Sequence, residues 1–290
     1  MKGIVLAGGN GTRLWPLTAS TSKQLLPVYD KPLIYYPLST LMLAGIHDIL
    51  IITRPQDLDQ FQRLLRDGAQ FGIKIQYKVQ ENATGIAEAF LIGEEFIGKS
   101  SVCLVLGDNI FYGQGLGDQL QTISAESRAT IFGYEVADPE RYGVIEIGKD
   151  RQVISIEEKP RVPKSKFVVP GLYFYPNTVI AATKSLVHSP RGELEITDLN
   201  IFYLENRLLD CRILTRGTAW FDTGTFKSLN DAANFLRVVE ERQGIKIGVP
   251  EEIAFRKNLV SESELANLIE NYPLNEYREY LENFLANYKE

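Results

Sequence analysis

The sequence predicts an α/β fold with a mixed, mostly parallel central sheet and helices on both of its faces. Two observations lead to this prediction. Short apolar runs alternate with segments of helical periodicity through the first half of the chain, which is typical of βαβ units with parallel strands. The 290 residues are also 44% apolar, which is enough to bury a sizeable core. We therefore expect one main domain without internal repeats.

The first half of the chain is expected to supply four strands and three helices. The expected strands are residues 3–7, 48–53, 73–79 and 101–106, and the expected helices are residues 32–44, 56–67 and 85–97. In the first of these helices, Ile34, Leu38 and Leu41 recur at helical spacing before Gly45. The run 101–106 is apolar almost throughout, which indicates a fully buried strand.

The pattern changes after about Ala129, because strands then follow one another with prolines between them. The expected strands are residues 130–136, 143–147, 153–157, 171–175 and 208–215, with helices at 195–205 and 226–241. A Ser-x-x-Glu capping box at Ser261 begins a further helical region. An apolar stripe in this region is expected to pack against the rest of the protein. The stripe consists of Tyr277, Tyr280, Leu281, Phe284, Leu285 and Tyr288. We expect residues 1–240 to form the main domain and residues 241–290 a helical C-terminal elaboration packed on it.

Charge and composition exclude several classes of protein. A net charge of −6 and a pI near 5.2 argue against nucleic acid and anionic membranes as main partners. Cys103 and Cys211 lie in apolar runs, so buried thiols are expected rather than a disulfide or a zinc site. The N-terminal apolar run is too short for a signal peptide, and no run approaches the roughly 18 residues of a membrane span. We expect a cytoplasmic protein.

A glycine-rich loop, Leu6-Ala-Gly-Gly-Asn-Gly-Thr-Arg13, directly follows the first expected strand. Glycines there let backbone amides approach a phosphate group closely. A dinucleotide fingerprint beginning at Gly9 would need glycine or alanine at position 14, which is Leu14, and no Gly-x-x-x-x-Gly-Lys-Ser/Thr motif occurs. Taken alone, the loop fits either a phosphate site or a glycine turn with solvated charges.

Seven longer motifs narrow this choice. They are residues 22–38, 106–113, 157–160, 171–175, 192–198, 219–224 and 250–257, the first of them beginning Ser-Lys-Gln-Leu-Leu-Pro-Val-Tyr-Asp-Lys-Pro. In this order they resemble the bacterial glucose-1-phosphate thymidylyltransferases of the sugar-phosphate nucleotidyltransferase family, from residue 1 to at least residue 257. The departures are mild: Gln114, Pro170 and Phe221 stand where this family commonly has histidine, threonine and leucine.

The resemblance implies a Rossmann-like catalytic domain that joins dTTP to glucose 1-phosphate and releases pyrophosphate, with Mg²⁺ as the cofactor. It also implies a homotetramer under feedback by a downstream dTDP-sugar. Related uridylyltransferases share the glycine loop but generally not the 22–32 stretch, so thymidylyl transfer is favoured. Uridylyl transfer and a non-catalytic sugar-nucleotide sensor stay open as alternatives, whereas the glycine spacing disfavours a nicotinamide oxidoreductase.

Two aspartates are candidate metal ligands. Asp108 follows the buried strand 101–106 at its carboxyl end, where open α/β sheets bind their ligands. Asp222 follows the apolar run 219–221 and matches the family's other metal-ligand position. Two carboxylates with phosphate oxygens make a hard oxygen site suited to Mg²⁺ rather than zinc. Without the resemblance, a turn-capping role would be preferred for Asp222.

Catalysis is expected to depend on positioned charge rather than on a base. A sugar phosphate is largely a dianion at neutral pH, so the nucleophile needs no proton removed. His47 and His188 lie in no catalytic-looking motif. The catalytic candidates are Arg13 and Lys23 for the departing phosphates, Asp108 for the metal, and Lys159 for the phosphate of the sugar. Any one of these cations could equally be a solvated surface residue.

The resemblance also implies the substrate contacts. The implied nucleotide-binding residues are Leu6, Gly8, Gly9, Gly11, Thr12, Arg13, Gln24, Gln80, Gly85 and Asp108. The implied sugar-phosphate-binding residues are Asn109, Gly143, Glu158, Lys159 and Val169. Of these, Gln24, Gln80 and Gly85 would read the pyrimidine base. Glu158 would accept hydrogen bonds from sugar hydroxyls.

Overall fold

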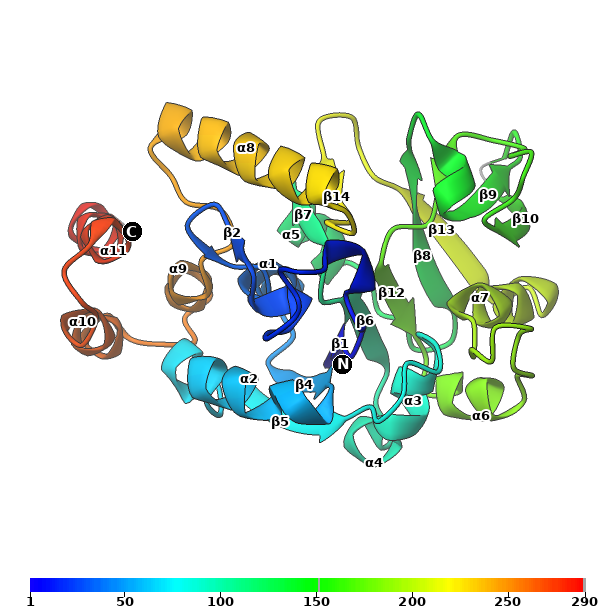
Figure 1. Ribbon diagram of the computed structural model, residues 1–290, viewed down its shortest axis with the longest axis horizontal. Helices are drawn as coiled ribbons and strands as arrows, with labels where there is room; N and C mark the ends of the chain where they lie inside the picture. Colours follow the sequence, from blue (N-terminus) through cyan, green and yellow to red (C-terminus); the bar gives the residue numbers. More distant parts are fainter. Residues whose placement is uncertain (151, 289–290) are drawn as a thin grey trace.

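The computed structural model describes residues 1–150 and 152–288, and within these ranges one sheet of ten strands forms the centre of the molecule (Figure 1). Nine of its strands lie in the order β10-β9-β11-β8-β12-β6-β1-β4-β5, and β13 pairs with β8. Both parallel and antiparallel neighbours occur. Helices pack on each face of this sheet. The predicted mixed α/β sheet is confirmed.

The parallel half of the sheet contains the four strands predicted first. β1 (Lys2–Ala7) lies between β4 (Asp48–Thr53) and β6 (Val102–Leu106), and β5 (Lys74–Val79) pairs with β4. Leu6 lies opposite Ile52 on one side and Leu106 on the other, so these strands end together at one edge. All four strands agree with the prediction to within one residue, because buried parallel strands are continuous apolar runs.

The three helices predicted in this half differ at their ends. The helix expected over 32–44 is α1 (Tyr35–Leu43), because Lys31–Pro32 forms β3, which pairs with β2 (Pro27–Val28). The helix expected over 56–67 is the 3-10 turn η3 (Pro55–Asp57) followed by α2 (Leu58–Leu65). The helix expected over 85–97 is divided at Gly93 into α3 (Glu88–Ile92) and α4 (Glu94–Ile97).

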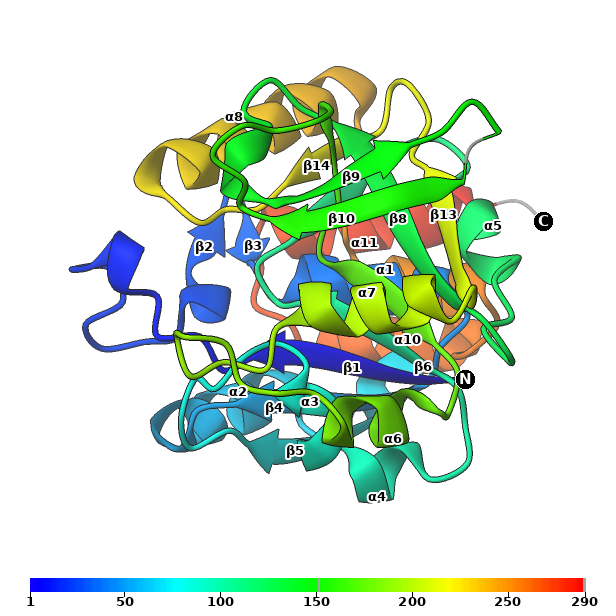
Figure 2. The ribbon, with the colours of Figure 1, turned by 90° about the vertical axis from the view of Figure 1, so that its right-hand side faces the viewer.

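The second half of the sheet is mostly antiparallel. Its strands are β8 (Ala129–Glu135), β9 (Gly143–Ile147), β10 (Val153–Glu158), β11 (Phe167–Val168), β12 (Leu172–Tyr175) and β13 (Leu209–Ile213). β12 runs antiparallel between β6 and β8, with Leu172 opposite Val105. Because β12 is reversed, the segment entering it meets the segment leaving β6. Helices α6 (Val179–Lys184) and α7 (Ile196–Glu205) follow, and Figure 2 shows β9, β10 and α7 facing the viewer.

A two-stranded ribbon lies beside the main sheet. It pairs β7 (Ile110–Tyr112) with β14 (Ala219–Phe221) in antiparallel fashion, and neither strand was predicted. Helix α5 (Leu116–Gln121) follows β7, and the long helix α8 (Phe226–Gln243) follows β14. A capping box of Thr225 and Ser228 begins α8, and Gly244 ends it in the left-handed conformation.

Three C-terminal helices cover the far side of the molecule from β9 and β10 (Figure 1). They are α9 (Pro250–Arg256), α10 (Glu262–Glu270) and α11 (Glu276–Asn287), of which α9 packs on α1. The predicted capping box at Ser261 is confirmed. In the apolar stripe, Leu281 is fully buried whereas Tyr288 is 36% exposed. The buried carboxylate of Glu251 accepts hydrogen bonds from Tyr272 and Tyr277, which ties α9 to α11 and to the segment between α10 and α11.

Alternating side chains of the strands supply two apolar cores. Val5 faces the core shared with α1, α2, α5 and α9, and Ile4 faces the core shared with α3, α4, α6 and α7. Cys103 is a buried free thiol whose pKa is raised by burial, and Cys211 is also free. Within the described residues, no helix is both long enough and apolar enough to span a membrane.

Candidate active site

A cavity of about 760 Å³ opens beyond the end of β6, beside the ends of β10 and the start of α7. Nine residues that the sequence analysis named line it: Thr12, Arg13, Asp108, Asn109, Gly143, Glu158, Lys159, Val169 and Asp222. The other named residues lie on or beside the glycine loop rather than on the cavity wall: Leu6, Gly8, Gly9, Gly11, Lys23, Gln24, Gln80 and Gly85. The metal, phosphate and sugar candidates therefore surround one space.

The β7–β14 ribbon brings the two predicted metal ligands together. Asp108 and Asn109 lead from β6 into β7, and Asp222 directly follows β14, where Phe221 lies opposite Ile110. Thr223 Oγ1 donates a hydrogen bond of 2.6 Å to the carbonyl of Asp108, which fixes the two segments to each other. More than a hundred residues separate the two aspartates in the chain, so their proximity depends on this pairing.

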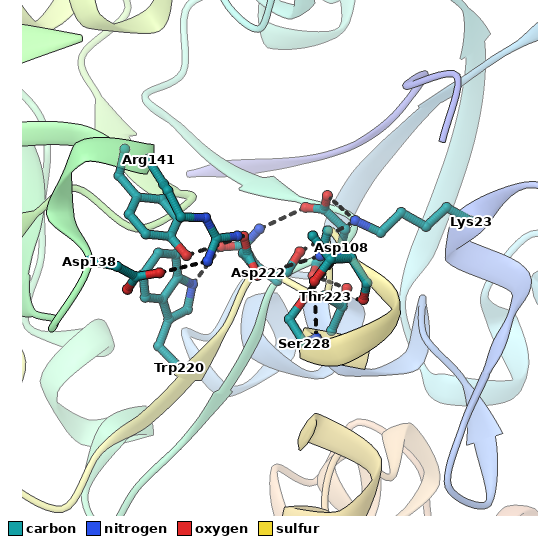
Figure 3. Close-up of polar contacts among 12 residues, drawn as sticks. Lys23, Asp108, Asp138, Arg141, Trp220, Asp222, Thr223 and Ser228 are labelled. Atoms are coloured by element: carbon teal, nitrogen blue, oxygen red, sulfur yellow. Dashed lines mark hydrogen bonds and ion pairs between the residues drawn. The ribbon is translucent and has the colours of Figure 1, made fainter. Parts of the chain in front are cut away.

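Each aspartate already has a cationic side chain beside it (Figure 3). Lys23 Nζ lies 2.6 Å from Asp108 Oδ2 and donates to the carbonyl of Asp222 at 3.3 Å. Arg141 Nη2 lies 3.2 Å from Asp222 Oδ2, and the hydroxyl of Tyr142 donates to the same oxygen at 3.3 Å. Lys23 is only 6% exposed, so the pair with Asp108 compensates a buried charge.

The oxygen atoms of Asp108 and Asp222 suit a hard divalent metal ion. Asp108 and Asp222 offer only oxygen ligands, and both remain partly exposed to the cavity, at 27% and 17% of their side chains. Among the described residues, no group of three or more His, Cys, Asp or Glu side chains could hold a metal. The protein could supply two carboxylates, and phosphate oxygens and water would have to complete an octahedral site. This arrangement suits Mg²⁺ rather than Zn²⁺.

Asn109 is held by hydrogen bonds on both ends of its amide. Its Oδ1 accepts from Trp220 Nε1 at 2.6 Å and from the backbone amide of Gly171 at 3.1 Å. Its Nδ2 donates to Asp108 Oδ1 at 2.7 Å. Because Asn109 is almost completely buried and bonded through both its oxygen and its nitrogen, it orients the Asp108 carboxylate. Trp220, which the sequence analysis did not single out, is thus part of the site.

The opposite wall carries an ionised glutamate with two cations. Thr197 Oγ1 donates to Glu158 Oε2 at 2.6 Å, and Lys159 Nζ lies 2.8 Å from Glu158 Oε1. Arg191 Nη2 lies 3.9 Å from the same oxygen. Burial would raise the pKa of Glu158, but the hydrogen bonds from Lys159 and Thr197 and the nearby positive charges lower it below its ordinary value. Glu158 is therefore an acceptor at neutral pH.

Two site residues adopt a left-handed backbone that is uncommon outside glycine. Lys159 has φ +44° just after β10, and Thr223 has φ +40° just after Asp222. Such conformations cost about 1–3 kcal/mol each and persist only where their surroundings hold them. For Thr223 the hydrogen bond to Asp108 is one such constraint. Lys159 itself lines the cavity, and so does Asp222, which directly precedes Thr223.

The glycine loop packs closely on its neighbours. A Cβ on Gly8 would lie 2.4 Å from Gln80 Oε1, and a Cβ on Gly85 would lie 2.3 Å from the carbonyl of Leu194. Gly85 also has φ +113°, which side chains rarely tolerate. Arg13 extends from η1 (Thr12–Leu14) over Gly224, where a Cβ would lie 2.9 Å from Nη2. At Gly85 the clash is with backbone, so glycine there is a packing requirement, whereas a side chain at Gly8 or Gly224 would displace the end of Gln80 or Arg13.

Sequence reasoning missed two arginines of the cavity. Arg141 ends η5 (Pro139–Arg141), and Arg191 directly precedes the 192–198 motif. Isolated arginines on loops carry no periodicity, although the position of Arg191 beside a motif was an available signal. By contrast, His47 and His188 are both exposed and do not line the cavity. The expectation that neither histidine belongs to the catalytic site agrees with this placement.

Comparisons with known proteins agree with the geometry. The family described as nucleotidyl transferase matches residues 2–238. A glucose-1-phosphate thymidylyltransferase of Mycolicibacterium smegmatis is 55% identical over 281 residues, covering 97% of this chain and 98% of the relative. One from Neisseria meningitidis is 55% identical over 282 residues with the same coverage. A solved Bacillus anthracis structure, assigned to the same enzymes and containing a sucrose, is 41% identical with a TM-score of 0.76, covering 82% of this chain and 95% of its own.

Proposed function

Because the chain belongs to the nucleotidyl transferase family and matches thymidylyltransferases over almost its whole length, we infer that it transfers a thymidylyl group from dTTP to glucose 1-phosphate. The products are dTDP-glucose and pyrophosphate. The structural observation that carries this inference is the convergence of Asp108 and Asp222 on one cavity that Arg13 and Lys159 also line. Two acids and two cations facing one space suit the transfer of a phosphorylated group.

The reaction needs no protein base. A phosphate oxygen of glucose 1-phosphate attacks the α-phosphorus of dTTP in line, and the bond from that phosphorus to the β-phosphate oxygen breaks as pyrophosphate leaves. The attacking oxygen carries no proton once the phosphate has lost its second proton, near pH 6. The obstacle is the approach of one anion to another. Positioned cations therefore supply the catalysis.

The cations of the cavity divide between the two phosphates. We propose that Arg13 holds the departing phosphates, because a guanidinium can meet two oxygens at once and its contacts strengthen as charge moves onto the leaving group. Lys159 and Arg191 lie on the wall around Glu158 and would hold the incoming sugar phosphate. The ionised Glu158 would accept hydrogen bonds from sugar hydroxyls, which fixes the orientation of the nucleophile.

We propose Mg²⁺ as the metal, held by Asp108 and Asp222. When bound, the ion would offset phosphate charge and polarise the α-phosphate as a Lewis acid. The chain's own contribution is to hold both carboxylates in place beforehand. Lys23 and Arg141 provide the matching charge, and Asn109 and Tyr142 provide hydrogen bonds.

A non-catalytic sugar-nucleotide sensor is the second candidate, and the charges of the site argue against it. A sensor would need Gln80 and Glu158 but not two acids that form ion pairs with Lys23 and Arg141.

We also propose the finer properties that the family resemblance implies. These are a homotetramer, feedback by a downstream dTDP-sugar, and a division into a catalytic domain over 1–240 and a C-terminal elaboration over 241–290.

The decisive experiment is a panel of dTTP, UTP, dCTP and ATP with glucose 1-phosphate, scored by pyrophosphate release with Mg²⁺ and with EDTA. We expect dTTP to be best and UTP to be slower by about tenfold to a hundredfold, because the two differ by one methyl and one hydroxyl. Pyrophosphate should form only when sugar phosphate and metal are both present. A preference for UTP, or no release with any nucleotide, would contradict the proposed function.

A further inference from the structure

The side chain of Gln80 is held by an acidic residue that belongs to no motif of the sequence analysis. Gln80 Nε2 donates to Glu88 Oε2 at 2.6 Å and to the carbonyl of Gly85 at 3.3 Å. Thr84 Oγ1 donates to the same oxygen of Glu88. Gln80 itself is 4% exposed, so its amide has little freedom to exchange these contacts for water.

These contacts fix which end of the Gln80 amide faces Glu88. A carboxylate and a backbone carbonyl accept hydrogen bonds but cannot donate them, so the amide nitrogen faces Glu88 and Gly85. The amide oxygen must then face the other way. It lies against Gly8 of the glycine loop, where a Cβ would come within 2.4 Å of Oε1. Among the described residues, no donor is hydrogen-bonded to this oxygen.

We propose that Glu88 is a positioning residue that sets base specificity by locking Gln80 with its oxygen toward the nucleotide. The proposal rests on the proposed function, in which Gln80 reads the pyrimidine. Thymine and uracil carry a hydrogen on N3 and can donate it to Gln80 Oε1. Cytosine has a lone pair on N3, which would face that oxygen without a hydrogen between them. A buried polar group left unpaired in this way rejects a ligand strongly.

The same physics explains why an amide alone would not be enough. A free glutamine side chain can turn over and present either a donor or an acceptor, so it could satisfy thymine and cytosine alike. Discrimination requires that one orientation be excluded. Glu88 excludes the turned-over orientation, because its carboxylate would then face the amide oxygen of Gln80. The carboxylate is held in place at the start of α3 (Glu88–Ile92), where Thr84 donates a hydrogen bond to the same oxygen.

The test compares kcat/KM for dTTP and dCTP in variants that change the partner of the Gln80 amide. In Glu88→Lys the ammonium can only donate, so the amide should turn over and offer Nε2 to the base. We expect the dTTP to dCTP ratio to fall by about tenfold or more. Glu88→Gln offers Gln80 either an acceptor or a donor, so its ratio should fall between those of the unchanged chain and Glu88→Lys. Glu81→Lys, an exposed neighbour with the same charge change, is the matched control.

Binding of dTDP and dCDP by calorimetry repeats the comparison without turnover, and Glu88→Met serves if Glu88→Lys does not fold. Glu88→Met lacks both donor and acceptor and should also lower the ratio. A folded Glu88→Lys or Glu88→Met with the ratio of the control would overturn the role of Glu88. Gln80→Met tests base recognition by Gln80 separately from its orientation by Glu88. If this variant keeps the ratio, Gln80 does not read the base, and the proposed role of Glu88 is wrong as well. If only Gln80→Met changes the ratio, Glu88 alone is refuted and the proposed function stands.

Discussion

The two sides of the site are built by different means. On the nucleotide side, Gly8 and Gly85 bring backbone against Gln80 and Leu194 so closely that one added carbon would overlap a neighbouring oxygen. On the metal and sugar-phosphate side, the ion pairs Lys23–Asp108 and Arg141–Asp222 hold two carboxylates that remain partly exposed. The first side is specified by shape and fixed hydrogen-bonding groups. The second is specified by charges that can exchange partners when phosphates arrive.

The largest effect is expected on the charged side. Asp108→Asn and Asp222→Asn should each lower turnover by about a hundredfold or more, because a bound metal contributes several kcal/mol of charge stabilisation and depends on ligand charge. The melting temperature should change little for Asp222→Asn. Asp108→Asn leaves the buried ammonium of Lys23 without its carboxylate, so this variant should fold but melt at a lower temperature. Pyrophosphate release at varied Mg²⁺ and thermal unfolding are the measurements.

Asp138→Asn is the control for these variants. It removes an acid that pairs with Arg141 at 2.8 Å but does not line the cavity. Its turnover should stay near normal. Near-normal turnover in Asp108→Asn or Asp222→Asn would remove that residue from the metal site.

The nucleotide side should respond to volume rather than to charge. Gly85→Ala places a Cβ 2.3 Å from the Leu194 carbonyl at φ +113°, so the free energy of unfolding should fall by about 3 kcal/mol and the KM for dTTP should rise. Gly244→Ala is the matched comparison, because Gly244 also has positive φ but has open space around it. It should cost only about 1–2 kcal/mol and leave KM unchanged. Urea unfolding that ranks the two variants equally would refute the role of close packing.

The smallest effect is expected from removing both histidines. The pKa of Glu158 is lower in the folded protein than in the unfolded chain. Its ionised form therefore stabilises the fold at every pH above its pKa in the unfolded chain, and this stabilisation is lost as the pH falls through its lower pKa in the folded protein. Glu158 therefore stays ionised over the pH range in which the substrate phosphate loses its second proton. The kcat/KM for glucose 1-phosphate should rise near pH 6 with the phosphate itself and then stay level. The double variant His47→Gln with His188→Gln should keep this profile.

A fluorinated sugar 1-phosphate, whose phosphate is more acidic, should move that rise to lower pH. A rise that stays fixed with the analogue would mean that the enzyme titrates rather than the substrate. Charge positioning without a base would then be wrong for this chain.

Much of the fold followed from periodicity. Strands such as 48–53 and 102–106 are buried on both faces, and burial forces a continuous apolar run that is visible in the sequence. The position of Asp108 followed from the same run, because parallel strands end at one edge. The glycine loop followed from its place after β1. The charged side chains assigned by resemblance line the cavity, except Lys23, which reaches it only through Asp108, and their roles remain predictions.

Other features were out of reach because they depend on distant partners. β7 and β14 have three residues each, and their pairing is decided by contact across more than a hundred residues rather than by local pattern. The start of α1 at Tyr35 depends on the pairing of β2 with β3 just before it. Arg141 and Arg191 enter the cavity through tertiary structure alone. The contact of Glu88 with the Gln80 amide could be found only in the three-dimensional structure.

The packing of α9 on α1 has a consequence for biosynthesis. Helix α1 is buried almost along its whole length, and part of its cover comes from residues that the ribosome adds more than two hundred positions later. At typical rates of synthesis, about 5–20 residues per second, roughly 10–40 s pass between the synthesis of α1 and that of α9. The nascent chain must therefore carry an incomplete apolar surface through most of its own translation.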